Sequence, residues 1–133
     1  MTPILYDPIA GLLFFRCSGD DCIHIAGQSS PFIRYCQIQA KTCGVRCFES
    51  SCPKIERCIV EKCGKQGISI MDDANLLAWH LNVCDCGEDG IVAMGSSKAS
   101  VLDCLIKENK GPGLDCSDDS NVRVERYDQR RRM

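Results

Sequence analysis

Four glycines recur along the chain at intervals of 23 residues: Gly44, Gly67, Gly90 and Gly113. An interval of this length is typical of solenoid proteins, in which each repeat is one unit that stacks on the next. After each glycine, apolar or small residues alternate with other residues, as in a short strand with one buried face. The alternating pairs are Val45 and Cys47, Ile68 and Ile70, Ile91 and Ala93, and Leu114 and Cys116.

Two further features repeat with the glycines. A polar corner follows each strand and is filled by turn-forming residues, with Ser50, Asp73, Ser96 and Asp119 in its first column and Ser51, Ala74, Ser97 and Ser120 in its second. A second apolar segment then follows, and its spacing predicts one strand after the bend. This segment contains Ile33, Cys36 and Ile38 in one repeat, and Ile55, Cys58 and Val60 in the next.

The repeat predicts an all-β, right-handed parallel β-helix of about five coils of 22–23 residues, with short terminal caps. Helices do not fit, because each apolar segment is too short and too often interrupted for three helical turns. With 133 residues, the chain is expected to form one domain. We expect an N-terminal cap over residues 1–11, coils over 12–124 and a basic tail over 125–133.

The segment 53–70 resembles the Pro-x-Ile-x-x-(Asn/Cys)-x-Ile-x-x-Asn-x-x-x-Gly-Ile-x-Ile repeat of the right-handed parallel β-helix (pectin-lyase-like) superfamily. That group includes copper-maturation proteins of the periplasm, carbohydrate-active enzymes, and β-helix regions of F-box substrate receptors and of SHC-binding, spindle-associated proteins. The resemblance covers residues 12–124 and implies the fold. It leaves the function open, since one fold serves many functions.

The chain departs from the superfamily at the column where an asparagine ladder is usual. The superfamily asparagine binds the backbone at the bend, but this chain has Cys63 and Cys86 before Asn109. A thiol is a poor substitute for an amide. We therefore expect these bends to depend more on packing.

Twelve cysteines would suit a disulfide framework in a secreted protein, but the N-terminus is a poor signal peptide. We therefore expect a reducing, cytoplasmic location and structural thiols. Cys36 stacks on Cys58, and Cys63 on Cys86, at a spacing compatible with disulfides, so these pairings stay open. The Cys84-Asp85-Cys86 cluster does not converge on one point, and no metal site or cofactor is expected.

Paired acids invite an enzymatic interpretation, because carboxylate pairs bind Ca²⁺ or act as acid and base. The pairs lie at residues 20–21, 72–73 and 118–119. Asp73 and Asp119 fall in the turn column, and five coils form a rod only about 24 Å long, without inserted loops for a cleft. An enzyme is therefore not expected.

The outward strand positions carry the candidate interaction surface. It consists of Trp79, Leu102, Ile59, Leu105 and Val92. Two interpretations of Trp79 and Leu102 remain: contact with a partner, or local packing of Trp79 into a corner against Leu102. After the last coil, a candidate docking tail contains Arg126, Arg130, Arg131 and Arg132, which could equally protect a solvated strand edge.

The expected function is a non-catalytic protein interaction or scaffold module. It would serve as a structural subunit of a larger eukaryotic assembly, such as a cytoskeletal or ciliary one, or as a substrate-recognition β-helix. A net charge of −2 and the absence of a long apolar run argue against nucleic-acid binding and membrane insertion. The alternative is a carbohydrate-binding or carbohydrate-active β-helix, which predicts aromatic and acidic residues side by side on one face.

Overall fold

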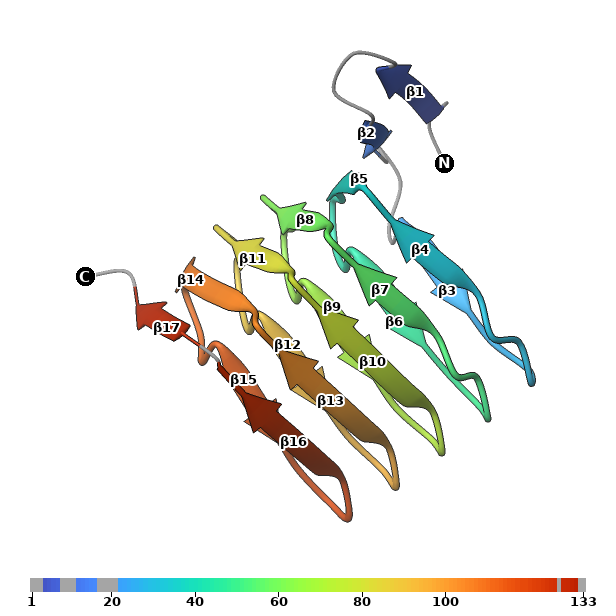
Figure 1. Ribbon diagram of the computed structural model, residues 1–133. Coiled ribbons are helices and arrows are strands. Elements are labelled where there is room, and N and C mark those ends of the chain that lie inside the picture. The colour runs from blue at the N-terminus through green and yellow to red at the C-terminus, as the bar shows by residue number, and fades with distance from the viewer. Residues whose placement is uncertain (1–3, 8–11, 17–21, 127, 132–133) are drawn as a thin grey trace.

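The computed structural model describes residues 4–7, 12–16, 22–126 and 128–131, with side chains described from 22 to 126. These residues form strands joined by short turns, and the strands stack in three sheets (Figure 1). Sheet A contains β1 (Ile4–Asp7), β2 (Leu12–Arg16), β5 (Cys36–Gln39), β8 (Ile59–Glu61), β11 (Asn82–Cys84), β14 (Leu105–Asn109) and β17 (Asp128–Arg131).

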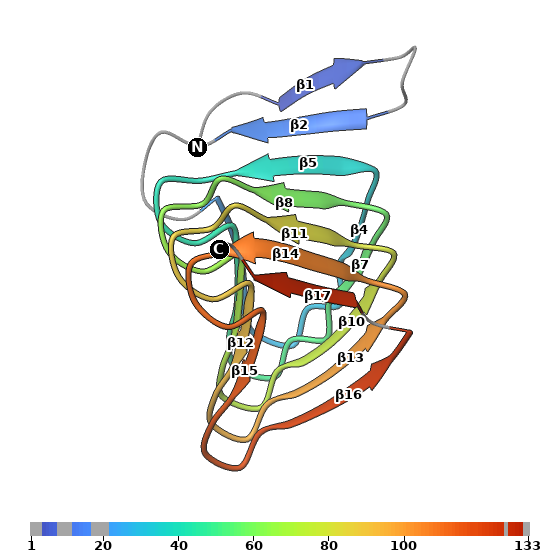
Figure 2. The same cartoon turned by 90° about the vertical axis from the view of Figure 1, so that its left-hand side faces the viewer.

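Sheets B and C have five strands each. Sheet B contains β3 (Ile23–Ile25), β6 (Val45–Cys47), β9 (Ile68–Ile70), β12 (Ile91–Ala93) and β15 (Leu114–Cys116). Sheet C contains β4 (Phe32–Arg34), β7 (Lys54–Glu56), β10 (Asn75–Trp79), β13 (Lys98–Leu102) and β16 (Asn121–Glu125). Each coil passes through sheets A, B and C in turn, so the predicted parallel solenoid is confirmed (Figure 2).

The register between coils follows the sequence repeat. Ile68 pairs with Val45 below it and Ile91 above it, and Val83 pairs with Val60 and Ile106. All of these side chains are fully buried between the three sheets. Apolar residues therefore stack on apolar residues along the axis, which produces one continuous core.

The second apolar segment of each coil was predicted as one strand, and this prediction was wrong. It forms two strands, one in sheet C and one in sheet A, and the residue that follows the sheet C strand has positive φ. These corner residues are Tyr35, Arg57, His80, Asp103 and Arg126, with φ between 48° and 54°. A left-handed residue turns an extended chain sharply, so a single position creates the corner.

The ladder of hydrogen bonds between coils continues through this corner. Arg57 N donates to Trp79 O at 2.9 Å, and His80 N donates to Leu102 O at 3.1 Å. Each left-handed residue thus remains bonded to the next coil. The backbone polar groups are satisfied although the chain changes direction.

The chain termini differ from the predicted cap and tail. β1 pairs antiparallel with β2 and extends sheet A at its N-terminal edge. At the other end β17 pairs with β14, so residues 128–131 of the predicted tail form a strand. Arg130 and Arg131 belong to that strand, whereas Arg132 lies outside the described residues.

Asn109 is the bend residue that retains the amide of the superfamily ladder. Its side chain is buried, its Oδ1 accepts Cys86 N at 2.9 Å, and its Nδ2 donates to Val83 O at 3.3 Å. Cys63 and Cys86 occupy the same column. Their thiols contact each other and donate long bonds to Glu61 O and Cys84 O in their own coils. Thiol contacts and packing therefore replace the amide contacts at these bends.

The repeating glycines are required by close packing between coils. A Cβ atom on Gly67 would lie 2.7 Å from Gly90 O and 2.7 Å from Val83 Cγ1. Gly44 and Gly90 have the same close approach to the carbonyl oxygen of the glycine in the next coil. Backbone atoms cannot move away from a methyl group without breaking the ladder.

We predict that Gly67→Ala lowers the free energy of unfolding by about 2 kcal/mol or more, because it overpacks a rigid backbone contact. Urea denaturation measures this change. Lys65→Ala is the control, since the Lys65 side chain is exposed, and it should change stability by less than about 0.5 kcal/mol. Equal stability of the two variants would contradict the packing explanation.

Candidate functional site

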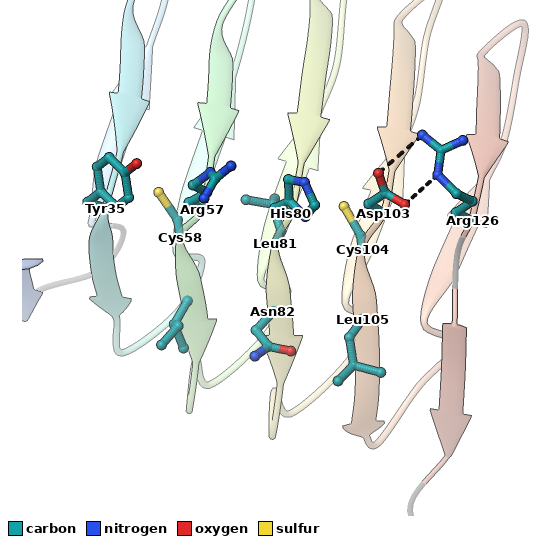
Figure 3. A pocket seen from close by; sticks show the side chains of 11 residues that line it. Tyr35, Arg57, Cys58, His80, Leu81, Asn82, Asp103, Cys104, Leu105 and Arg126 are labelled. Atoms are coloured by element: carbon teal, nitrogen blue, oxygen red, sulfur yellow. Dashed lines mark hydrogen bonds and ion pairs between the residues drawn. The ribbon is translucent and has the colours of Figure 1, made fainter.

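The corner between sheets C and A is hollowed on the described surface. It is an open groove of about 780 Å³ that crosses several coils. Its row of corner side chains comes from successive coils, as Figure 3 shows. The lining residues are Tyr35, Arg57, Cys58, Ile59, His80, Leu81, Asn82, Asp103, Cys104, Leu105 and Arg126.

Three members of the predicted surface lie beside this corner. Ile59 and Leu105 line its sheet A side, where Asn82 pairs with both in register, and all three are half-buried. Leu102 ends β13 on the sheet C side and is paired with Trp79. The structure therefore brings four of the five predicted surface residues to one corner.

Trp79 packs at the corner, and its side chain remains partly exposed. Its Nε1 donates to Asp103 Oδ2 at 3.4 Å, and its ring lies 4.7 Å from His80 and 5.7 Å from the Arg57 guanidinium. These contacts and its pairing with Leu102 hold it against the corner. The side chain is nevertheless 37% exposed, so part of it is available to a partner.

Arg126 was predicted as part of a docking tail, but it is fixed at the end of the corner row. Its guanidinium donates to both carboxylate oxygens of Asp103, at 2.5 and 3.1 Å (Figure 3). This fork keeps the pKa of Asp103 below its ordinary value, and the Trp79 hydrogen bond acts in the same direction. The pair positions Trp79 from the neighbouring coil.

Val92 was predicted to face outward as part of the surface, and this prediction was wrong in one respect. The side chain is only 6% exposed, so a partner has little access to it. Beside it, the Asp89 carboxyl of the turn before sheet B contacts Asp115, the residue paired with Val92. Burial and the Asp115 carboxylate raise the pKa of Asp89.

The sequence prediction missed four exposed apolar side chains. Phe32 is 54% exposed, Tyr35 and Val124 39% each, and Leu77 36%. Leu77 lies two residues before Trp79 on the same strand, so strand alternation could have placed it on the same face. Phe32 lies two coils before Leu77 in the same column. Lys54 lies in the coil between them and pairs with both. We call Phe32, Leu77, Trp79 and Leu102 the apolar face of sheet C.

The paired acids have structural partners in the turns between sheets B and C. Asp72 Oδ2 accepts Glu49 N at 2.8 Å, and Asp118 Oδ2 accepts Gly95 N at 3.1 Å. Each carboxylate thus bonds to the coil below it. Asp73 and Asp119 are exposed at the turns, and the pair at residues 20–21 lies outside the described residues.

Most of the described cysteines are buried among apolar residues. Burial raises the pKa of the Cys47 thiol to about 12 and that of Cys84 to about 11. Cys36 and Cys58 share a hydrogen bond that lowers the pKa of Cys36 and raises that of Cys58, and Cys63 with Cys86 form a second such pair. Cys52 and Cys116 are exposed.

The part of the chain that the structure describes has neither a metal-binding cluster nor a membrane-spanning helix. No group of three or more His, Cys, Asp or Glu side chains in that part of the chain is arranged to hold a metal ion. It also includes no helix with the length and apolarity that crossing a bilayer requires.

The fold places the chain in the class of parallel β-solenoids. The family profile described as "Right handed beta helix region" matches residues 16–128. The chain therefore belongs to the right-handed β-helix family. A comparison with curated proteins found no match, and neither did a comparison with solved structures.

We predict that the free energy of unfolding falls as the pH rises from about 9 to about 12. In this window an unfolded thiol, with its ordinary pKa of 9.0, loses its proton, whereas folded Cys47 keeps it until about pH 12. The folded state then binds more protons than the unfolded state, so stability decreases with pH. Urea denaturation at pH 8, 9.5 and 11 measures the trend.

Cys47→Ala is the control for this pH dependence, because Ala93 occupies the same column in a later coil. The variant retains the other groups that titrate at high pH. Its free energy of unfolding should therefore fall less between pH 9 and 11 than that of the wild type. Parallel pH profiles would show that the Cys47 thiol does not contribute.

Proposed function

We propose that this β-helix is a non-catalytic module that binds another protein, as a scaffold subunit of a larger assembly or as a substrate-recognition element. The observation that carries the proposal is the apolar face of sheet C. Phe32, Leu77 and Trp79 are each more than one-third exposed on a rigid sheet beside an open groove. Contiguous apolar side chains of this kind mark interaction sites.

The rigidity of this surface supports binding. Strands β7, β10 and β13 hold the face in a fixed register, and the ion pair of Asp103 with Arg126 holds its edge. A preorganised surface loses little conformational entropy when it binds. Aromatic anchors such as Trp79 contribute strongly to binding energy when a partner covers them.

The proposal includes a reducing, cytoplasmic setting, in which the stacked thiol pairs of the core stay reduced. A structural subunit of a eukaryotic assembly, with cytoskeletal and ciliary assemblies among the candidates, fits a rod with exposed flat faces. A substrate-recognition module uses the same surface. Both roles require the sheet C face and no chemistry.

A specific contact favours one alternative, binding of a carbohydrate. The Trp79 indole is hydrogen-bonded to the Asp103 carboxylate in the open groove, so an aromatic ring and an acid lie side by side, as that hypothesis predicted. A glycan array tests it. Under this alternative, wild-type binding to a glycan is lost in Asp103→Asn; under our main proposal, the array gives no specific binding.

For the main proposal, we predict that Trp79→Ala/Leu102→Ala loses a stoichiometric partner that the wild type captures from its native cell lysate under reducing conditions. The double variant removes two anchors from the apolar face. Quantitative mass spectrometry of the captured proteins measures the loss, which we expect to be at least tenfold. Circular dichroism and thermal melting confirm that the variant remains folded.

The matched control is Asp73→Ala/Ser96→Ala, two exposed changes in the turns between sheets B and C. It should capture the partner as the wild type does. If the wild type is recovered alone, or if both double variants lose the partner equally, the sheet C face is not the binding surface.

A further inference from the structure

The charges of the chain are unevenly distributed, and sheet C with its corner is the basic part. The described residues that point outward there include six cations and three acids. The excess is three positive charges, whereas the whole chain carries −2. The cations are Arg34, Lys54, Arg57, Lys98, Arg123 and Arg126, and the acids are Glu56, Asp103 and Glu125.

Each acid of this surface is already paired with a neighbouring arginine. Glu56 pairs with Arg57 at 3.3 Å and Glu125 with Arg123 at 2.9 Å. Asp103 pairs with Arg126, as described above. The acids therefore neutralise three of the cations and leave the charge of the other three uncompensated within the sheet.

The uncompensated cations lie on the same sheet as the apolar face. Among the described residues, Arg34, Lys54 and Lys98 form no ion pair. Lys54 pairs in register with both Phe32 and Leu77, so it occupies the position between two exposed apolar residues. Lys98 begins β13, the strand beside β10. A small depression lies between Phe32, Leu77 and Trp79. Lys54 and Glu56 line it as well, and the Glu56 carboxylate is paired with Arg57.

We propose that sheet C docks an acidic protein segment, which inserts an apolar side chain between Phe32, Leu77 and Trp79 and places its carboxylates against Lys54 and Lys98. This inference rests on the proposed interaction function and specifies the chemistry of the partner. Charge complementarity of this kind steers association and selects partners. The net negative charge of the rest of the chain repels acidic segments elsewhere and so favours this face.

The same cations and aromatic rings could suit a single-stranded nucleic acid, but the contacts favour a protein. Base stacking needs free ring faces. The Arg34 guanidinium lies over the rings of Phe32 and Tyr35, at 5.1 and 5.0 Å, and Arg57 lies over Trp79. Leu77 and Leu102 offer apolar surface with no counterpart on a phosphate backbone. An apolar segment with carboxylates matches both features.

The test selects 12-residue peptides from a random display library against the wild-type chain. We predict that the selected peptides combine Asp or Glu with an aromatic or large aliphatic residue. Lys54→Glu/Lys98→Glu should weaken their binding at least tenfold, as measured by isothermal titration calorimetry. Raising NaCl from 50 to 300 mM should weaken wild-type binding severalfold, since exposed charges are screened.

The matched control is Lys41→Glu/Lys65→Glu, which makes the same change in charge in the turns between sheets A and B, where both lysines are exposed. It should bind the selected peptides as the wild type does. Equal loss in the two charge-reversal variants would overturn the assignment to sheet C, because it would mean that net charge alone controls binding.

Two further outcomes separate this inference from the proposed function. The selection could yield apolar peptides without acids, whose binding is lost in Leu77→Ser/Trp79→Ser but kept in Lys54→Glu/Lys98→Glu. That result would overturn the acidic partner and leave the proposed interaction function intact. Selection of no peptide, together with no partner in the lysate, would overturn both. Poly(U) RNA that binds more tightly than the peptides and competes with them would also overturn the acidic partner.

Discussion

The register of the backbone ladder between coils determines nearly every other property of this protein. Because each strand pairs with its equivalent 22 or 23 residues away, each side chain contacts the same position of the next coil. The core is therefore a set of columns, and so is the surface. Gly67 illustrates how tight this stacking is, since a methyl group there would meet the backbone of the next coil.

The fold could be predicted from the sequence because the period of the glycines and the alternation of apolar residues describe the ladder directly. The corner between sheets C and A could not. No single residue type marks the left-handed turn, because the corner positions hold different kinds of side chain: Tyr35, Arg57, His80, Asp103 and Arg126. Val92 shows a second limit: alternation gives the direction of a side chain but not how deeply its neighbours bury it.

The candidate site was partly visible in the sequence. Trp79 and Leu102 stood out as large apolar residues at outward positions, and the structure places them on sheet C. Leu77 could have been joined to Trp79 by strand alternation, whereas Phe32 is placed near them only by the register of sheet C. The pairing of Asp103 with Arg126 was hidden for another reason, because Arg126 was assigned to a tail, whereas the chain continues beyond it into β17.

At the corner between sheets C and A, the backbone conformation does not determine which side chain the surface carries. One backbone conformation recurs there in five coils with tyrosine, arginine, histidine and aspartate side chains. The left-handed conformation is most unfavourable for β-branched residues, and none occurs at these five positions. The chemistry of the row can therefore change from coil to coil while the architecture of the rod stays constant.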